Sequence, residues 1–428
     1  MEIELQNLKG TKDFLPQEQV VRNKIIDILK DNFEKYGYLP IETPMLNNFD
    51  LLSYKYQDGA EILSEIYRLK DQGKRDLGLR YDLTVPFCKV IGLNKDLTMP
   101  FRRYEIGKVF RDGPVKTGRA REFYQCDIDV VGIDGRLIEV EQMLMVKNVF
   151  KALGIPVVIK WNNRKLMSGL LSLANVPEDI VEKAISLIDR LEKISKNELI
   201  AEFNSIGIDS NAVDNILQLF SKTLGEYLDL ATQTDNQFLK DGASECQELN
   251  SLIEKLELSD ICQFEPKLAR GLSIYTGTVF EFFDKEKRIS SSLGGGGRYN
   301  KIITEFMDNG TYYPAVGLCF GLEPIYAIMA KQEQPSFVDV FVVPMGTEME
   351  CLKLATTLRQ NGIKTLVDMN NKKVKKSFEY ANKTNIKYVV VVGSNEIESG
   401  LFALKDMQTG NQQSVTLNQM LEIVKQRI

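Results

Sequence analysis

One arginine-rich segment of the sequence has the residue types that bind polyphosphate. From Phe110 to Phe123 it reads F-R-D-G-P-V-K-T-G-R-A-R-E-F, so two strand-like ends flank a loop with Gly, Pro and several cations. A guanidinium group can bind two phosphate oxygens at once, and a hairpin can aim such groups at one ligand. Taken alone, the segment fits either a phosphate-binding hairpin or a solvated basic hairpin.

Two further segments combine glycine with arginine. Leu268 to Gly277 places Arg270 within an otherwise apolar, strand-like pattern, where a charge must be paired or face a cavity. Leu293 to Tyr299 reads L-G-G-G-G-R-Y, and glycines at this density let a backbone approach a ligand closely. Each has a plainer reading: a structural ion pair for the first, and a flexible hairpin tip for the second.

The chain contains no histidine. This excludes mechanisms built on imidazole, such as Ser-His-Asp triads, Cys-His pairs and HExxH metal sites. The six cysteines occur singly, without C-x-x-C or zinc spacing, which is typical of free thiols in a reducing compartment. Any catalysis must therefore use carboxylates, arginines, lysines, backbone groups or a bound metal.

The elements that must position these segments fall into two strand-rich regions separated by helices. Strand patterns such as Met99–Phe110 and Glu122–Val131 follow one another without helical crossovers, which predicts an antiparallel sheet. Between about Asn163 and Leu258 the hydrophobic period is helical, which predicts an insertion. After a predicted linker at Gln332–Ser336, strands alternate with helices, as in a small α/β domain with parallel strands.

These patterns predict an α+β fold with three parts. Residues 1–162 and 259–330 are expected to form the sheet domain, 163–258 the helical insertion and 336–428 the C-terminal domain. No apolar run is long enough to cross a bilayer, and the first ten residues lack the apolar core of a secretory signal. We therefore expect a cytoplasmic protein with no membrane association.

Together, and in this order, the motifs resemble those of histidyl-tRNA synthetases over essentially the whole chain. Gly10–Pro16 looks like the N-terminal signature of that family, and Glu42–Pro44 is similar to class II motif 1, whose proline sits at the dimer interface. Arg111–Gln125 resembles motif 2, and Leu268–Gly277 resembles the histidine-specific R-G-L-x-Y-Y motif. Gly296–Tyr299 looks like the G-G-R-Y element, and Val316–Glu323 resembles motif 3.

The resemblance implies a class II synthetase, with an antiparallel-sheet catalytic domain that carries the helical insertion and a C-terminal α/β anticodon-binding domain. Its expected activity is activation of L-histidine with ATP and Mg²⁺, then transfer to the 3′ end of tRNA-His, by a homodimer. The alternative is a non-catalytic paralogue that acts as a regulatory subunit or as a histidine or tRNA sensor. Since the regulatory form generally lacks the C-terminal domain, we expect the enzyme.

The resemblance also assigns residues to ATP. Arg111 and Arg270 are expected to stabilise the α-phosphate from two sides while the histidine carboxylate attacks it, which requires charge stabilisation and not proton transfer. Arg119 and Arg121 would assist with the nucleotide. Glu122 would lie near ATP or a magnesium ion, although no side chain is identified as a metal ligand.

A second set of residues is assigned to histidine by the same resemblance. Asp82 and Thr84 match the positions that hold the α-amino group, and Gln125 matches a further substrate-contacting position. Asp129 and Tyr275 match the pair that grips the imidazole ring. A carboxylate and a phenol can hydrogen-bond both ring nitrogens, which is the discrimination that a histidine site needs.

The chain departs from the family at two places. Pro324 stands where motif 3 usually has the arginine that binds the far phosphates of ATP. Ser273 and Ile274 replace a polar residue and the first tyrosine of Y-Y. We hypothesise that Arg119, Arg121 or Arg298 compensates for the missing motif 3 arginine.

Overall fold

The computed structural model describes residues 4–54, 61–115, 120–191, 194–270, 274–331, 336–370 and 373–426. Its internal contacts divide the chain into two compact units. One unit holds residues 1–13 and 24–328, and the other holds residues 14–23 and 329–428. Helix α1 (Pro16–Lys35) belongs in part to each. Arg119, Ser273 and residues 332–335 of the predicted linker lie outside the described residues.

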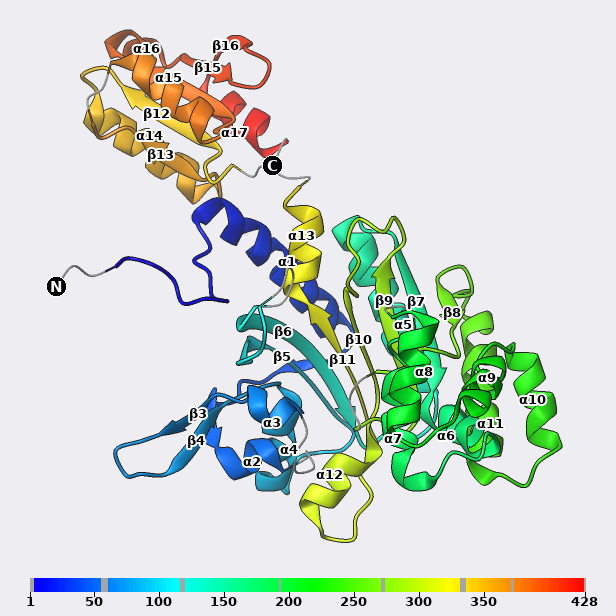
Figure 1. The fold of residues 1–428 in the computed structure, drawn as a ribbon. Coiled ribbons are helices and arrows are strands. Elements are labelled where there is room, and N and C mark those ends of the chain that lie inside the picture. The colour runs from blue at the N-terminus through cyan, green and yellow to red at the C-terminus, as the bar shows by residue number, and fades with distance from the viewer. Residues whose placement is uncertain are drawn as a thin grey trace. The chain divides into compact units, whose positions relative to one another are not determined.

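The first unit is built on an eight-stranded sheet with the order β1-β5-β6-β11-β10-β9-β7-β8 (Figure 1). Its strands are β1 (Leu39–Pro40), β5 (Phe101–Phe110), β6 (Glu122–Val131), β7 (Val157–Asn163), β8 (Cys262–Phe264), β9 (Thr278–Asp284), β10 (Gly294–Arg298) and β11 (Ala315–Gly321). Neighbours are antiparallel except at the two edges, where β1 pairs with β5 and β7 pairs with β8 in parallel. The predicted α+β fold with an antiparallel-rich sheet is confirmed.

The two faces of the sheet differ in polarity because successive side chains of a strand point to opposite faces. On β6, Cys126 and Ile128 are fully buried in apolar surroundings, while Asp127 and Asp129 point the other way. We call the second side the polar face. By strand register it carries Arg103, Glu105, Gly107, Gln125, Asp127, Asp129, Gly295, Gly297, Gly317 and Cys319.

Helices α1 and α5 (Leu137–Leu153) cover the opposite, apolar face. The ring of Phe33 lies 5.6 Å from that of Phe320, and the ring of Phe150 lies 5.5 Å from that of Phe282. Burying large aromatic side chains contributes roughly 1.5–3 kcal/mol each, so this face supplies much of the stability.

A small sheet and several helices are inserted between β1 and β5. The sheet has the order β2-β4-β3, and the elements are β2 (Leu46–Asn48), α2 (Phe49–Ser53), α3 (Glu61–Glu65), β3 (Arg68–Lys70), β4 (Asp76–Leu79) and α4 (Thr84–Leu93). The strand-rich pattern of the sequence up to Val131 did not predict α2, α3 or α4. Pro86 occupies the first turn of α4, where a missing N–H costs nothing.

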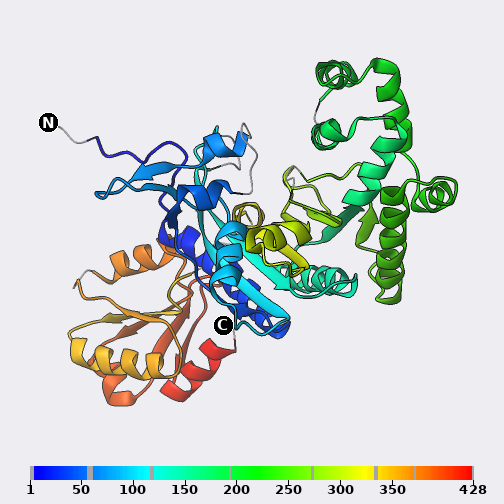
Figure 2. The same cartoon turned by 90° about the horizontal axis from the view of Figure 1, so that it is seen from below.

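Helices occupy the segment for which an insertion is predicted. They are α6 (Arg164–Leu173), η1 (Glu178–Ile180), α7 (Val181–Ile188), α8 (Lys196–Ser205), α9 (Ser210–Leu219), α10 (Leu224–Thr232) and α11 (Gln237–Lys255). These helices, green in Figures 1 and 2, gather beside the β7–β8 edge of the sheet. Two more helices, α12 (Asn300–Met307) and α13 (Leu322–Met329), follow β10 and β11. The domain boundaries themselves stay a prediction.

The second unit holds a five-stranded sheet with the order β13-β12-β14-β15-β16. Its elements are β12 (Val340–Pro344), α14 (Glu348–Gln360), β13 (Thr365–Val367), α15 (Val374–Lys383), β14 (Tyr388–Val392), α16 (Ser394–Ser399), β15 (Phe402–Asp406), β16 (Gln412–Val415) and α17 (Leu417–Lys425). The first three strands in the chain pair in parallel, as predicted. The last two strands, β15 and β16, do not alternate with long helices and pair antiparallel.

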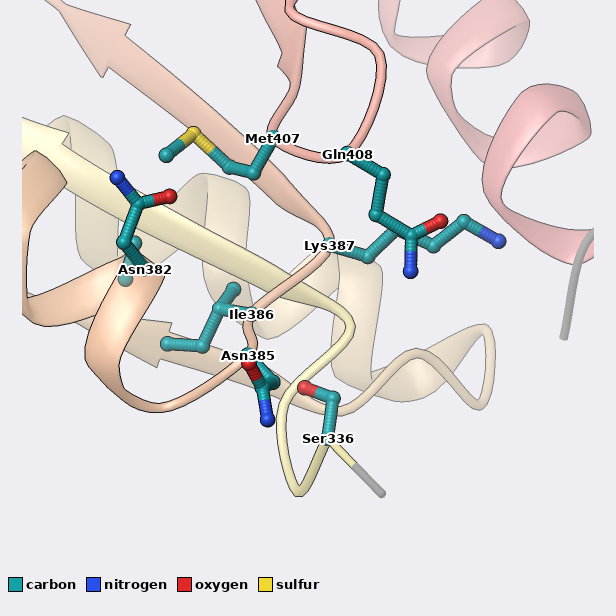
Figure 3. A pocket seen from close by; sticks show the side chains of 8 residues that line it. Ser336, Asn382, Asn385, Ile386, Lys387, Met407 and Gln408 are labelled. Carbon is teal, nitrogen blue, oxygen red and sulfur yellow. The ribbon is translucent and has the colours of Figure 1, made fainter. Parts of the chain in front are cut away.

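A cavity of about 310 Å³ lies in the second unit between the end of α15 and the turn after β15 (Figure 3). Asn382, Asn385, Lys387 and Gln408 are among its lining residues, and no arginine or carboxylate is. It therefore lacks the groups expected for amino-acid activation. In the part of the chain that the structure describes, no helix is long and apolar enough to cross a membrane.

Candidate active site

Two paired glycines make room for the side chains that are expected to bind the imidazole ring. Gly317 of β11 pairs with Asp129 of β6 and with Gly297 of β10. A Cβ on Gly317 would lie 2.0 Å from Oδ1 of Asp129, and a Cβ on Gly297 would lie 2.9 Å from the ring of Tyr275. Both positions therefore exclude any side chain. As a result, the Asp129 carboxylate lies over β11 and the Tyr275 ring lies over the adjacent strand β10.

A third glycine makes room for Arg270. A Cβ on Gly295 would lie 2.1 Å from Nη1 of this arginine, whose Nε is 3.8 Å from Oε1 of Glu281. The guanidinium carbon also lies 5.7 Å from the centroid of the Tyr275 ring. Two sequence interpretations need correction here. Residues 268–270 precede the strand instead of forming part of one, and the glycine run is strand β10 instead of a hairpin tip.

Buried partners hold the Asp129 carboxylate in place. Nη2 of Arg103, a fully buried arginine, is 2.5 Å from Oδ2 of Asp129, and the Tyr299 hydroxyl donates to Oδ1. Burial raises the pKa of Asp129, although Arg103 and Tyr299 act in the opposite direction. Sequence reasoning did not identify Arg103 or Tyr299 as partners of Asp129, because the contacts join residues far apart in the chain.

The motif 1 segment connects to the same buried charges. Oε1 of Glu105 accepts hydrogen bonds from the backbone N–H and the hydroxyl of Thr43, each at 2.9 Å. Arg80 lies 2.8 Å from the same oxygen, and Arg103 lies 3.6 Å from Oε2. Each buried charge here has an opposite partner, as low-dielectric surroundings require.

Asp82 and Thr84 lie at the start of α4. Oδ1 of Asp82 accepts a hydrogen bond of 3.1 Å from the backbone N–H of Val85, and the carboxylate is largely buried. Thr84 is the first residue of the helix and is half-buried. The helix start therefore fixes Asp82, since a carboxylate that accepts an N–H near a helix N-terminus is stabilised there.

Gln125 lies on the polar face beside Cys319. Its Nε2 contacts Sγ of Cys319 at 3.5 Å, while its buried Oε1 has no hydrogen-bond partner among the described residues. Burial raises the pKa of the Cys319 thiol well above its ordinary value, so this cysteine stays a thiol. The amide oxygen of Gln125 is thus available to accept a hydrogen bond from a ligand.

Asp127 is a further carboxylate on the polar face that sequence reasoning missed. Only 5% of it is exposed, and its Oδ1 has no hydrogen-bond partner within the described ranges. Burial raises its pKa to about 7, and the charge of Arg103 opposes this increase. The signal was present in the sequence, because strand alternation places Asp127 on the same side as Gln125 and Asp129.

Arg111 follows β5 and is held between two aromatic rings. Its guanidinium carbon lies 4.2 Å from the ring centroid of Tyr81 and 4.9 Å from that of Phe123. Within the described part of the chain, no carboxylate lies within ion-pair distance of it. The Nε of Arg111 donates a hydrogen bond of 3.4 Å to the Tyr81 carbonyl, and stacking does not use the Nη groups, so Arg111 can still bind an anion through them.

The remaining motif 2 residues lie at the base of the same hairpin. Arg121 has its Nη2 3.3 Å from Oδ1 of Asp112, and its backbone carbonyl accepts a hydrogen bond of 2.9 Å from the N–H of Arg111. Glu122 forms an ion pair with Lys108 across β5 and β6. The predicted arginine-bearing hairpin is thus formed by β5 and β6.

Arg298 points away from the polar face. Its Nε is 2.9 Å from Oε1 of Glu139, and Nη2 donates to the carbonyl of Gly135 at 2.7 Å. Both side chains of the pair are almost fully buried. These contacts occupy the guanidinium of Arg298, so among the described candidates for compensating Pro324 only Arg121 lies near the hairpin, and Arg119 is outside the described residues.

A bound magnesium ion would have to share its ligands with ATP. No group of three or more metal-ligating side chains occurs among the residues that the structure describes. Mg²⁺ in nucleotide sites is commonly held by one or two carboxylates and the substrate phosphates, so the residues present fit an ion carried by ATP. Glu122 directly follows Arg121, one of the arginines predicted to contact ATP.

Comparisons with known proteins match this architecture along both units. The histidyl-tRNA synthetase family profile matches residues 10–325, and an anticodon binding domain profile matches residues 339–427. Histidine–tRNA ligase 1 of Bacillus cereus is 44% identical over 98% of this chain and 99% of its own. Histidine–tRNA ligase of Clostridium tetani is 32% identical over 98% of this chain and 97% of its own.

A solved structure agrees with the fold. The crystal structure of a histidyl-tRNA synthetase from Nostoc sp. covers 100% of both chains with a TM-score of 0.87 and 29% identity. This likeness defines the fold as that of a class II aminoacyl-tRNA synthetase. The chain belongs to the histidyl-tRNA synthetase family.

Proposed function

We propose that this chain activates L-histidine with ATP to form histidyl-adenylate and then transfers the histidyl group to the 3′ end of tRNA-His. The observation that carries the proposal is the set of three glycines that accommodates Asp129, Tyr275 and Arg270. This set allows a carboxylate, a phenol and a guanidinium to lie side by side on the polar face.

The two arginines have complementary parts in the first step. Arg111, stacked between rings, would bind the α-phosphate of ATP, and Arg270 would stabilise charge that develops there during attack. Arg121 would contact the nucleotide from the base of the hairpin, as would Arg119. Because Arg111 and Arg270 are held before the reaction, they would stabilise the transition state without reorganisation.

The histidine-binding residues surround the same area. Asp129 and Tyr275 would hold the imidazole ring, with Arg103 and Tyr299 fixing the carboxylate. Asp82, Thr84 and Gln125 would bind the amino-acid backbone. Mg²⁺, when bound, neutralises phosphate charge, and Glu122 would help to hold it.

The proposal includes a homodimer, tRNA binding by the C-terminal unit and a cytoplasmic location. Near the motif 1 proline, apolar side chains are exposed at Leu39, Met45 and Leu46, which supports an interface there. The match of residues 339–427 to anticodon binding domains supports the tRNA. The cysteines are all free thiols, which supports a reducing compartment.

ATP–pyrophosphate exchange with each standard amino acid tests the proposal. Exchange with histidine alone, followed by charging of tRNA-His transcript, is the expected result. A folded protein that binds histidine or tRNA without any exchange would instead identify a regulatory or sensing paralogue. Light scattering of the purified chain checks the dimer separately.

A further inference from the structure

Asp127 lacks the cationic partner that Glu105 and Asp129 have, although the Cys319 thiol hydrogen-bonds to its carboxylate. On the polar face, Arg80 pairs with Glu105 at 2.8 Å and Arg103 pairs with Asp129 at 2.5 Å. Among the described residues Asp127 makes no ion pair, and its buried Oδ1 accepts no hydrogen bond. A buried carboxylate without a cation is costly, so the ligand-free site is short of one positive charge next to Asp127.

The neighbouring residue on the same face lacks a donor as well. Gln125 is two residues away on β6, and its buried Oε1 is also without a hydrogen-bond partner in the described ranges. The α-carbons of two such residues are about 7 Å apart along the strand, and both side chains point to the same face. Two acceptors placed in this way match a ligand group with several N–H donors. An ammonium group has three N–H donors and the positive charge that the ligand-free site lacks next to Asp127.

Strand register places Asp127 between the two ends of the proposed substrate. Asp129, the expected ring-binding residue, is two residues along β6. Asp127 pairs with Cys319, and Cys319 pairs with Gly295, over which Arg270 lies. If the histidine ring lies at Asp129 and the carboxylate points towards Arg270, the α-carbon of the histidine lies over Asp127.

We propose that Asp127 binds the α-ammonium group of histidine and so selects ligands that carry this group. The proposal rests on the proposed function, which supplies histidine as the ligand. Asp127 thereby acts as a substrate-binding residue in addition to Asp82, Thr84 and Gln125. Its charge is neutralised by the amino acid and not by a protein side chain.

Two histidine analogues separate this role from a ring contact. Histidinol keeps the ring and the ammonium group, whereas imidazolepropionate keeps the ring and the carboxylate but has no ammonium group. Calorimetric titration of both into wild type and Asp127→Asn measures the effect. We expect the variant to bind histidinol about 10- to 100-fold more weakly, as for loss of a charged hydrogen bond, and imidazolepropionate within about 3-fold of wild type.

Asp129→Asn provides the matched control, because the same change at the ring-binding carboxylate should weaken both analogues. Equal weakening of both analogues by Asp127→Asn, or no weakening of either, would overturn the proposal while leaving the proposed function in place. Wild type that binds neither histidine nor histidinol would overturn the proposed function together with it. Thermal unfolding of Asp127→Asn at or above the wild-type temperature is expected, since a buried charge is removed.

Discussion

The carboxylate of Asp129 occupies the space that a side chain at Gly317 would need. The two residues are register partners on β6 and β11, and a Cβ on Gly317 would lie 2.0 Å from Oδ1. The pairing is central to the site because Arg103 and Tyr299 hold the same carboxylate from other elements. Any displacement of Asp129 would therefore disturb several buried contacts at once.

Gly317→Ala is expected to impair histidine recognition. The added methyl group would push Asp129 out of its position, and a shift of about 1 Å can cost roughly 100-fold in kcat/KM. The loss should appear as a raised KM for histidine in pyrophosphate exchange, with the KM for ATP little changed. Gly225→Ala is the control, since no atom lies within 4 Å of a Cβ there. Wild-type kinetics in Gly317→Ala would contradict the assignment of Asp129.

Arg270→Gln is expected to reduce the rate of activation far more than it weakens histidine binding. Loss of one preorganised donor to the transition state typically lowers kcat by about 100- to 1000-fold. Pyrophosphate exchange and histidine titration measure the two quantities separately. Arg288→Gln, at an arginine 2.8 Å from Asp284, should leave both unchanged. An Arg270→Gln variant with normal kcat would remove this arginine from the mechanism.

Binding of the ATP tail is expected to depend on Arg121 and to improve with Pro324→Arg. Pro324 is the third residue of α13, so an arginine fits the helix there and would regain the family's phosphate contact. One charged hydrogen bond is worth about tenfold in KM for ATP. We expect Arg121→Ala to raise this KM and Pro324→Arg to lower it. If neither variant changes the KM for ATP, the compensation hypothesis is rejected.

Arg298→Ala is expected to destabilise the fold. Removing Arg298 takes away the nearer cation of the buried Glu139 and leaves only Arg136, whose Nε is 3.5 Å from Oε2, and breaking such a buried ion pair costs about 3–5 kcal/mol. Urea unfolding should show a lower midpoint. The double variant Arg298→Met with Glu139→Leu should recover part of the loss, because the buried carboxylate is removed and Arg136 keeps Glu245 as an ion-pair partner at 3.0 Å. A stable Arg298→Ala protein with a raised KM for ATP would point to nucleotide binding instead.

Affinity for histidinol is expected to rise with pH through about 7, where Asp127 titrates. The charged and titratable groups around Asp127 are Arg103, Glu105, Asp129, Cys319 and Asp82. Its pKa is raised from 3.8, so the folded chain binds an extra proton between those values and its stability falls as pH rises across that window. Ionised Asp127 attracts the ligand ammonium group, whereas the protonated carboxyl group does not.

Comparing the histidinol affinities of wild type and Asp127→Asn isolates the titration of Asp127. The imidazole of histidinol also titrates, but it affects the affinities of both proteins equally. Titrations at about pH 6 and about pH 8 should show the wild-type advantage over the variant growing with pH. A constant ratio of the two affinities would place the titration of Asp127 outside this range.

Elements with a strong hydrophobic period could be predicted from the sequence almost to the residue. The predicted strand at Glu122–Val131 is β6 as observed. In contrast, β10 could not be predicted, because Gly294–Gly297 has no side chains to alternate and glycine has a low strand propensity. Only the pairing of β10 with β9 and β11, two long-range contacts, makes it a strand.

The site was predictable to a similar extent. The motifs identify Arg111, Arg270 and Asp129, and strand alternation would also have identified Asp127. The role of Tyr299 was not predictable, because its contact with Asp129 joins residues 170 positions apart. Such a contact exists only once the sheet order is known.

The glycines of β10 and β11 also limit how the gene for this chain can vary. Every single-base change in a glycine codon that changes the amino acid introduces a residue with a Cβ atom or a stop codon. At Gly295, Gly297 and Gly317 that atom would collide with Arg270, Tyr275 or Asp129. We therefore expect random mutagenesis followed by selection for growth to recover synonymous changes at these three codons and no others.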